Sequence, residues 1–313
     1  MRLPFHLPAS KDFDAVGFGL NAVDHLIVVA EYPRFDTKVR FSEYQRSAGG
    51  QTASAMVALQ RLGLKTAYAG RFGSDEDGRF GLRAMEGEGV NLDFAETIAG
   101  ADNQVAFIII DARSGERTII WDRDDRLSYR PEEVPIELAG RGCVLHLDAH
   151  DPPACVVMAK AARAAGAIVT ADIDNVYEGV EALLPLIDVL ITSAEFPNRL
   201  LGIKDHRGGI LELKTRFGCP IVGVTRGSDG ALIYCEGEFI SSPAFAVPGG
   251  CRDTTGAGDA FHAGFIYGVL RGEDLESCLR WGNAVGALKC RSLGARAALP
   301  GLDELTEFVA RRS

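Results

Sequence analysis

Residues 253–261 read DTTGAGDAF, and the stretch HAGFIYGVL that follows at 262–270 is apolar enough to form a buried helix. Small residues that run directly into a helix leave backbone N–H groups unpaired and pointing to one place. The N-terminus of a helix also carries a partial positive charge. The stretch therefore predicts a binding site for an anion such as a phosphate group.

Asp259 separates this stretch from an ordinary glycine-rich turn, which is what the glycines alone would indicate. A bound phosphate repels a neighbouring carboxylate, so a carboxylate at this place needs a task. The natural task is to take the proton from a hydroxyl group that attacks phosphorus. Together the residues predict a phosphoryl-transfer site with its own general base.

The whole run resembles the C-terminal motif, DTxGAGD, of the PfkB or ribokinase-like family of carbohydrate kinases. The resemblance implies that Asp259 is the catalytic base and that Gly256, Ala257 and Gly258 form the hole for the transferred phosphoryl group. It extends over roughly residues 14–305 and implies a kinase that uses ATP and Mg²⁺.

Composition narrows the class of protein. The chain has 313 residues, 47% of them hydrophobic, and a net charge of −10, which argues against a nucleic-acid-binding surface. Seven scattered cysteines without a CxxC pair indicate reduced thiols. The N-terminus lacks an apolar signal-peptide core, and no apolar run is long enough to span a membrane. We expect a cytoplasmic protein without membrane partners.

Short β-type runs alternate with helical stretches along the chain, which favours a mostly parallel sheet covered on both faces. The resemblance names this fold as a ribokinase-like α/β/α sandwich, and the absence of repeats and linkers predicts one domain over 1–313. Strands are expected at 16–20, 66–72, 144–147, 167–172, 189–192 and 221–225, with a hairpin at 231–235 and 238–241. Helices are expected at 52–62 and 75–86, around Met158, Leu183 and Leu213, and after Gly256 and Asp274.

Two pairs of β-type runs, within about 25–47 and 103–122, do not fit this alternation. They predict a small antiparallel sheet that stands off the main one. The resemblance implies that this sheet is a lid over the sugar. Because its strands are more apolar than a solvated flap needs, we expect a homodimer formed through the lid.

The resemblance implies a sugar site formed by Asp24, Arg117 and the segment AGGQTAS at 48–54. Asp24 follows the first strand, where ligands bind in open α/β sheets; a surface aspartate is the alternative. Gly49 and Gly50 allow close backbone approach to a ligand. The family pattern is GGNxxN, so Gln51 and Ser54 depart from it and leave the sugar contacts open. Arg117 is either a substrate contact or a strand-edge arginine.

The resemblance places the nucleotide along TRGSDGA at 225–231, through Thr225, Gly227 and Gly230, with Asn283 beside the adenine. Glu195, in TSAE where relatives have NxxE, would position Mg²⁺ through water. Asp253 and the Thr255 carbonyl could hold a monovalent cation such as K⁺, which occurs behind the anion hole of some relatives.

Other classes of protein have weaker support. Residues 17–22 (GFGLNA) fit a dinucleotide-binding GxGxxA turn, but a β-type run follows where an NAD-dependent oxidoreductase needs a helix. His146, Asp148 and His150 have the residue types of a metal-hydrolase site. No GxxxxGK(S/T) or GxSxG motif is present. A non-catalytic sugar-binding relative would lack the base.

The substrate is the least constrained prediction. The segment at 31–33 (EYP) and the C-terminal stretches at 258–262 and 287–290 resemble the ketohexokinase and sulfofructose kinase branch. A keto-sugar phosphorylated on a primary hydroxyl is therefore the first expectation. Ribose, 2-keto-3-deoxygluconate, a sugar phosphate and a nucleoside remain alternatives.

Overall fold

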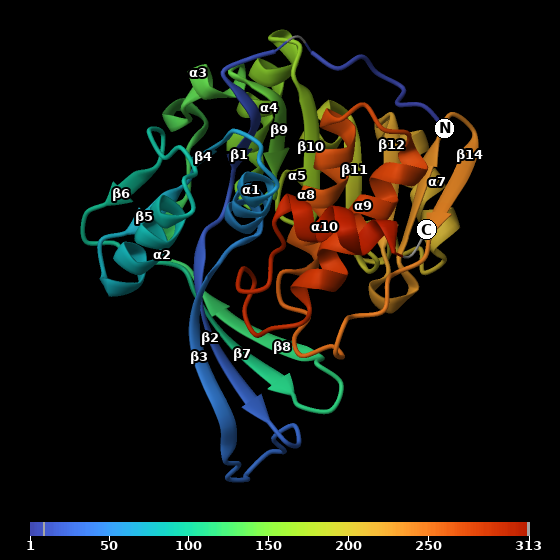
Figure 1. The fold of residues 1–313 in the computed structure, drawn as a ribbon. Coiled ribbons are helices and arrows are strands. Elements are labelled where there is room, and N and C mark those ends of the chain that lie inside the picture. The colour runs from blue at the N-terminus through green and yellow to red at the C-terminus, as the bar shows by residue number, and fades with distance from the viewer. Residues whose placement is uncertain (9, 312–313) are drawn as a thin grey trace.

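The computed structural model describes residues 1–8 and 10–311, and within them the large sheet has eight strands in the order β14-β13-β12-β11-β10-β9-β1-β4 (Figure 1). All neighbours are parallel except at the β13–β14 hairpin and its junction with β12. The strands are β1 (Phe13–Phe18), β4 (Thr66–Ala69), β9 (Gly142–Leu147), β10 (Ile168–Ile173), β11 (Val189–Ser193), β12 (Ile221–Thr225), β13 (Ala231–Cys235) and β14 (Glu238–Ser242).

Helices cover both faces of this sheet, and each face has its own apolar core. One layer contains α1 (Gln51–Arg61), α8 (Ala257–Leu270), α9 (Leu275–Lys289) and α10 (Leu302–Ala310), and Figure 1 shows the last three in front of the sheet. The other contains α3 (Ile136–Ala139), α4 (Pro152–Ala164), α5 (Val180–Leu183), α6 (Phe196–Leu201) and α7 (His206–Phe217). This arrangement confirms the three-layer prediction.

Helices α1 and α8 begin without a side-chain cap, and this matters for the site. Helix α9 shows the contrast. Helix α9 begins with a conventional cap, in which Asp274 accepts a hydrogen bond from the Ser277 amide at 2.8 Å. Helices α1 and α8 instead follow Gly50 (φ 90°) and Gly256 (φ 75°), and neither has a side-chain cap. A Cβ on Gly256 would lie 2.7 Å from the Ala295 Cβ, so both the backbone angle and the packing require glycine.

A second, smaller sheet has the strand order β3-β2-β7-β8 and stands away from the large one (Figure 1). Its strands are β2 (Ala22–Val29), β3 (Phe41–Gly49), β7 (Val105–Asp111) and β8 (Arg117–Asp122). The prediction of two β-type pairs is confirmed, but a wholly antiparallel sheet is wrong, because β2 and β7 pair in parallel. Both strands leave the main body in the same direction, and each returns through its own hairpin partner.

The predicted strand 66–72 divides at Gly70. After β4 the chain bends into β5 (Arg71–Gly73), which pairs with β6 (Glu96–Ile98) outside the large sheet. The Asn21 amide holds the bend by donating to the Arg71 carbonyl at 2.7 Å. Helix α2 (Glu76–Gly87) follows, and 3₁₀ turns span 125–127, 131–133, 184–186 and 227–229.

Further predictions concern the turn that follows β1, membrane-spanning helices and the cysteines. Strand β2 begins at Ala22, so the GxGxxA turn at 17–22 leads into a strand and lacks the helix that dinucleotide binding requires. Across residues 1–8 and 10–311, no helix combines the length and apolar character needed to cross a bilayer. All seven cysteines lie in the described part of the chain, and none of them forms a disulfide there.

Candidate active site

One cavity of about 1180 Å³ extends from the small sheet to the C-terminal ends of the large sheet's strands. It is larger than the roughly 300–1,000 Å³ typical of a pocket for one small ligand. Its wall includes Asp24 and Gln51 from the expected sugar site, Asp259 from the motif, and Thr225 and Asn283 from the expected nucleotide site. The cavity therefore has room for two ligands that meet near Asp259.

The middle of the cavity is formed by the first turn of α8. Gly256, Ala257, Gly258 and Asp259 all line it, as the motif predicts. The Ala257 amide, however, already donates to the Thr254 carbonyl at 3.1 Å. Since no side chain caps the helix, the other first-turn amides, including that of Gly258, are the ones that face a ligand. This geometry is compatible with the expected hole, in which Ala257 would shape the backbone.

Carboxylates from two elements gather at this point. Asp172, at the end of β10, and Asp174 just after it line the same cavity as Asp259. Burial and the neighbouring Asp172 raise the pKa of Asp259. Burial, Asp172 and Asp148 raise the pKa of Asp174 to about 6. This surplus of negative charge suits a divalent cation, which could keep most of its own water here.

Asp172 is compensated from within the protein. Its Oδ1 lies 3.3 Å from the His262 Nε2, and the Gln51 side chain also donates to the carboxylate. Burial alone would raise the pKa of Asp172, but His262 and Gln51 outweigh burial and lower it. Gln51 thus faces the cavity from the first position of α1 and is held by a carboxylate of β10.

The predicted sugar end is built around Asp24, which is 5% exposed. Burial raises its pKa to about 7, with Arg296 opposing the shift. The Arg296 guanidinium is itself buried and donates to the Gly49 carbonyl and, at 3.2 Å, to the Ser54 hydroxyl. A Cβ on Gly49 would lie 2.2 Å from the Asp24 Oδ2, so glycine permits this packing.

Some residues of the segment 49–54 therefore line the cavity, and others support the wall from beneath. Gly50 and Gln51 line the cavity, whereas Gly49 and Ser54 are buried beneath it. Ser54 is 1% exposed and faces Arg296, so its predicted direct contact with substrate is replaced by support of the glycine pair.

Arg117 links the small sheet to the phosphate end. It begins β8, lines the cavity, and its Nη1 donates to the Thr254 hydroxyl at 2.7 Å. The Thr254 hydroxyl in turn donates to the Gly115 carbonyl at 3.2 Å. The guanidinium therefore lies beside the motif, where it can contact an anionic ligand.

The residues predicted to bind the nucleotide all lie on the cavity wall. Thr225, Gly227, Gly230 and Asn283 all line the cavity. The Asn283 amide donates at 3.1 Å to the carbonyls of Ser242 and Pro243, so it braces the chain that follows β14. The amide nitrogen of Asn283 is therefore committed to the wall.

Two residues predicted to hold metals lie apart from the cavity wall. Glu195 is exposed at the start of α6, while Ser193, two residues earlier, lines the cavity. Asp253 is fully buried behind the motif, and its carboxylate accepts hydrogen bonds from the amides of Thr255 and Gly294, both at 2.8 Å. Thr255 lines the cavity.

The histidine cluster has structural partners. Asp148 accepts hydrogen bonds from the Leu20 amide at 2.5 Å and the Thr52 hydroxyl at 2.8 Å, and the His146 Nδ1 lies 2.9 Å from the Thr170 hydroxyl. Among residues 1–8 and 10–311, no group of three or more His, Cys, Asp or Glu side chains could hold a metal ion. The metal-hydrolase alternative therefore lacks a ligand set.

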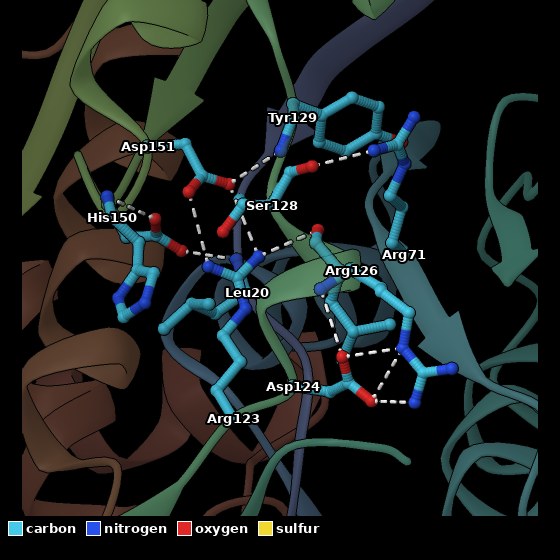
Figure 2. A network of polar contacts seen from close by, with 12 residues as sticks. Leu20, Arg71, Arg123, Asp124, Arg126, Ser128, Tyr129, His150 and Asp151 are labelled. Carbon is cyan, nitrogen blue, oxygen red and sulfur yellow. Dashed lines mark hydrogen bonds and ion pairs between the residues drawn. The ribbon is translucent and has the colours of Figure 1, made fainter. Parts of the chain in front are cut away.

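Next to this cluster, a polar network fastens the exit of β8 to the main body (Figure 2). Arg123 pairs with Asp151 at 3.2 Å and donates to the Leu127 carbonyl at 2.9 Å. Asp151 also accepts from the Tyr129 amide at 3.2 Å. The network sets the position of β8, and with it Arg117, relative to the large sheet.

Sequence reasoning missed three charged residues of the site. Asp172 and Asp174 had a signal, because Asp172 ends the predicted strand 167–172 and Asp174 follows it, at the edge where ligands bind. Arg296, in the loop between α9 and α10, had none, since nothing local connects it to Gly49.

Comparison with known proteins agrees with this geometry. Residues 15–302 match the pfkB family of carbohydrate kinases. An uncharacterized sugar kinase of Archaeoglobus fulgidus is 35% identical over 256 residues, or 78% of this chain and 98% of that protein. A nucleoside kinase of Methanothermobacter thermautotrophicus is 26% identical over 96% of this chain and 97% of its own.

The fold has solved counterparts. The structure of Arabidopsis thaliana ribokinase complexed with ribose and ATP is 23% identical, with a TM-score of 0.78 over 96% of this chain and 99% of that one. The match covers both the large and the small sheet, because so little of either chain lies outside it. The chain is therefore a kinase of the pfkB carbohydrate kinase family.

Proposed function

We propose that the protein transfers the γ-phosphoryl group of ATP to a primary hydroxyl of a small sugar or sugar-like substrate. One observation carries the proposal: the Asp259 carboxylate lies in the first turn of an uncapped helix, on the wall of a cavity large enough for two ligands. A base and an anion hole at one point are what in-line phosphoryl transfer requires.

Asp259 acts as the general base. Burial and the neighbouring Asp172 raise its pKa, which makes its carboxylate a stronger proton acceptor than that of an exposed aspartate. It takes the proton from the attacking hydroxyl as the oxygen approaches phosphorus. The proton moves to the carboxylate, the new O–P bond forms, and the bond from phosphorus to the ADP oxygen breaks.

The first-turn amides of α8 and the Arg117 guanidinium offset the charge that develops on the transferred group. Mg²⁺ supplies further charge neutralisation when bound. The residues that would hold it through water are Asp174 and Asp172 at the cavity wall, with Glu195 reaching from the start of α6.

The sugar binds between Asp24, Gly50 and Gln51, with Asp24 accepting hydrogen bonds from adjacent hydroxyls. The nucleotide extends along Thr225, Gly227 and Gly230, with the adenine near Asn283. The small sheet closes over the sugar and excludes water, which would otherwise compete as the acceptor.

A homodimer through the small sheet is part of the proposal. Its strands carry large apolar side chains that are about half exposed and lie outside the cavity lining: Phe41, Tyr44, Phe107 and Ile120. A second copy of the chain would cover them. Analytical ultracentrifugation should give a dimer, and Ile120→Lys should give monomers with the same far-UV circular dichroism.

A keto-sugar is the first substrate to test, and a nucleoside or 2-keto-3-deoxygluconate is the alternative within the same fold. Asp24 lines the sugar end, and the buried Arg296 behind it donates to the Gly49 carbonyl. This nearly neutral pocket favours a polyhydroxyl group over a second phosphate or a carboxylate.

The deciding experiment measures ADP release from Mg-ATP with ketoses, aldoses, sugar acids and nucleosides, beside the Asp259→Asn variant. Turnover with one substrate class that disappears in the variant supports the proposal. ATP binding without any turnover would reject the proposed substrates. Failure to bind ATP, measured by calorimetry, would reject the ATP-dependent mechanism.

A further inference from the structure

A buried lysine lies directly behind the anion hole. Lys289 is the last residue of α9 and is 0% exposed. Lysine is almost never fully buried unless it is paired, because its ammonium group loses its hydration. Its Nζ donates to the Asp253 backbone carbonyl at 2.8 Å and lies 3.7 Å from the Asp253 carboxylate, which is also fully buried.

Asp253 connects this ammonium group to the phosphate end. Its two carboxylate oxygens accept hydrogen bonds from the Thr255 and Gly294 amides, so the side chain fixes the start of the motif and the loop after α9. The Arg252 amide donates to the Cys290 carbonyl at 2.9 Å and adds a second tie between the same segments. The backbone at 253–256 therefore depends on the state of the Asp253 carboxylate.

Electrostatics give the lysine a role beyond packing. Without a positive partner, the Asp253 carboxylate would be an uncompensated buried charge, which is strongly destabilising. Lys289 also lies at the C-terminus of α9, where the helix dipole favours a cation. Burial lowers the pKa of Lys289, and Asp253 opposes that shift.

We propose that the Lys289 ammonium group takes the place of a monovalent cation behind the anion hole, so that the enzyme works without K⁺. Asp253 fits a free cation poorly, because Nζ already occupies its carbonyl and lies beside its carboxylate. Lys289 is a positioning residue: it holds Asp253, and Asp253 holds the backbone that presents the amides. The inference rests on the proposed kinase function for its kinetic part only.

The test compares wild type, Lys289→Ala and Lys289→Met in K⁺, NH₄⁺, Na⁺ or choline at constant ionic strength. Wild-type turnover should change less than twofold between K⁺ and choline. In choline, both variants should lose about 100-fold in kcat/KM, the scale of losing one anion-hole donor. K⁺ or NH₄⁺ should restore at least about tenfold to Lys289→Ala, whose shortened side chain leaves space for an ion. Lys289→Met fills that space and should not respond.

A second measurement is independent of catalysis. The melting temperature of Lys289→Ala should rise by about 3 °C when K⁺ replaces choline, while wild type, Lys289→Met and the exposed-site control Lys204→Ala should not shift. If the kinase proposal fails, no variant turns over but this pattern persists. A tenfold K⁺ requirement in wild type would overturn the inference without needing any variant. A folded Lys289→Ala that ignores K⁺ in both assays would overturn it as well.

Discussion

The phosphate end and the sugar end of the cavity handle buried charge in opposite ways. At the phosphate end, Asp172, Asp174 and Asp259 line the cavity, and burial together with the neighbouring Asp172 raises the pKa of the last two. At the sugar end, the carboxylate of Asp24 has a buried guanidinium, Arg296, behind it. The phosphate end thus gathers several carboxylates that a bound cation would offset, whereas Asp24 has a positive partner within the protein that offsets part of the cost of its burial.

This difference indicates which end of the cavity contributes mainly to substrate affinity and which mainly to the chemical step. A site with surplus negative charge gains most when metal-bound nucleotide arrives, so its residues act mainly on the chemical step. A compensated site is formed before its ligand arrives, so its residues act mainly on affinity. Variants at the two ends should therefore separate into effects on kcat and effects on KM.

The largest effect is expected at the phosphate end. Asp259→Asn keeps the shape of the side chain but removes the proton acceptor, so kcat should fall by about 1,000-fold or more. The KM values for sugar and nucleotide should stay within about threefold, because the amide occupies the same space. Steady-state ADP release and calorimetric ATP binding check both. A kcat loss below tenfold would mean that another group accepts the proton.

At the sugar end, Asp24→Ala should raise the KM for the sugar by about 100-fold, the cost of losing hydrogen bonds from substrate hydroxyls to a charged acceptor. The KM for ATP should stay within about twofold, since Thr225 and its neighbours lie at the far end of the cavity. Initial-rate kinetics with each substrate varied in turn give both values. Equal rises in the two KM values would contradict the division between the ends.

Asp24 also gives the sugar end a pH signature. Its folded pKa of about 7 lies above the ordinary value of 3.8, so the folded state holds the proton more tightly. The stability from this group is complete below pH 4 and is lost as the pH rises through 7. Between pH 5 and 6.5, wild type should lose about 2 kcal/mol more unfolding free energy than Asp24→Asn. Urea unfolding of both proteins at each pH, without ligands, measures this difference. If the unfolding free energies of wild type and Asp24→Asn changed in parallel with pH, the raised pKa of Asp24 would be ruled out.

Sequence could indicate the local geometry of the phosphate end because its residues are contiguous. Gly256, Gly258 and Asp259 owe their placement to local backbone geometry, and an uncapped helix start is a property that the sequence displays. Lys289 and Arg296 act through contacts with residues distant in the chain, at Asp253 and Gly49, and such contacts leave no local pattern. The same limit explains the small sheet: periodicity indicates a strand, but the direction of its partner depends on the path of the intervening chain.

The smallest effect is expected where a residue supports the wall without contributing charge. Asn283→Ala removes the hydrogen bonds to the Ser242 and Pro243 carbonyls that hold the chain after β14 against α9. Losing net hydrogen-bond free energy of about 1 kcal/mol should raise the KM for ATP about fivefold and leave the sugar KM and kcat unchanged. Ser242→Ala is the matched control, because it removes only the hydroxyl partner of Asn283 and keeps both carbonyl contacts. If Asn283→Ala changed kcat instead, the nucleotide wall would be coupled to Asp259, and the two ends could not be treated as separate.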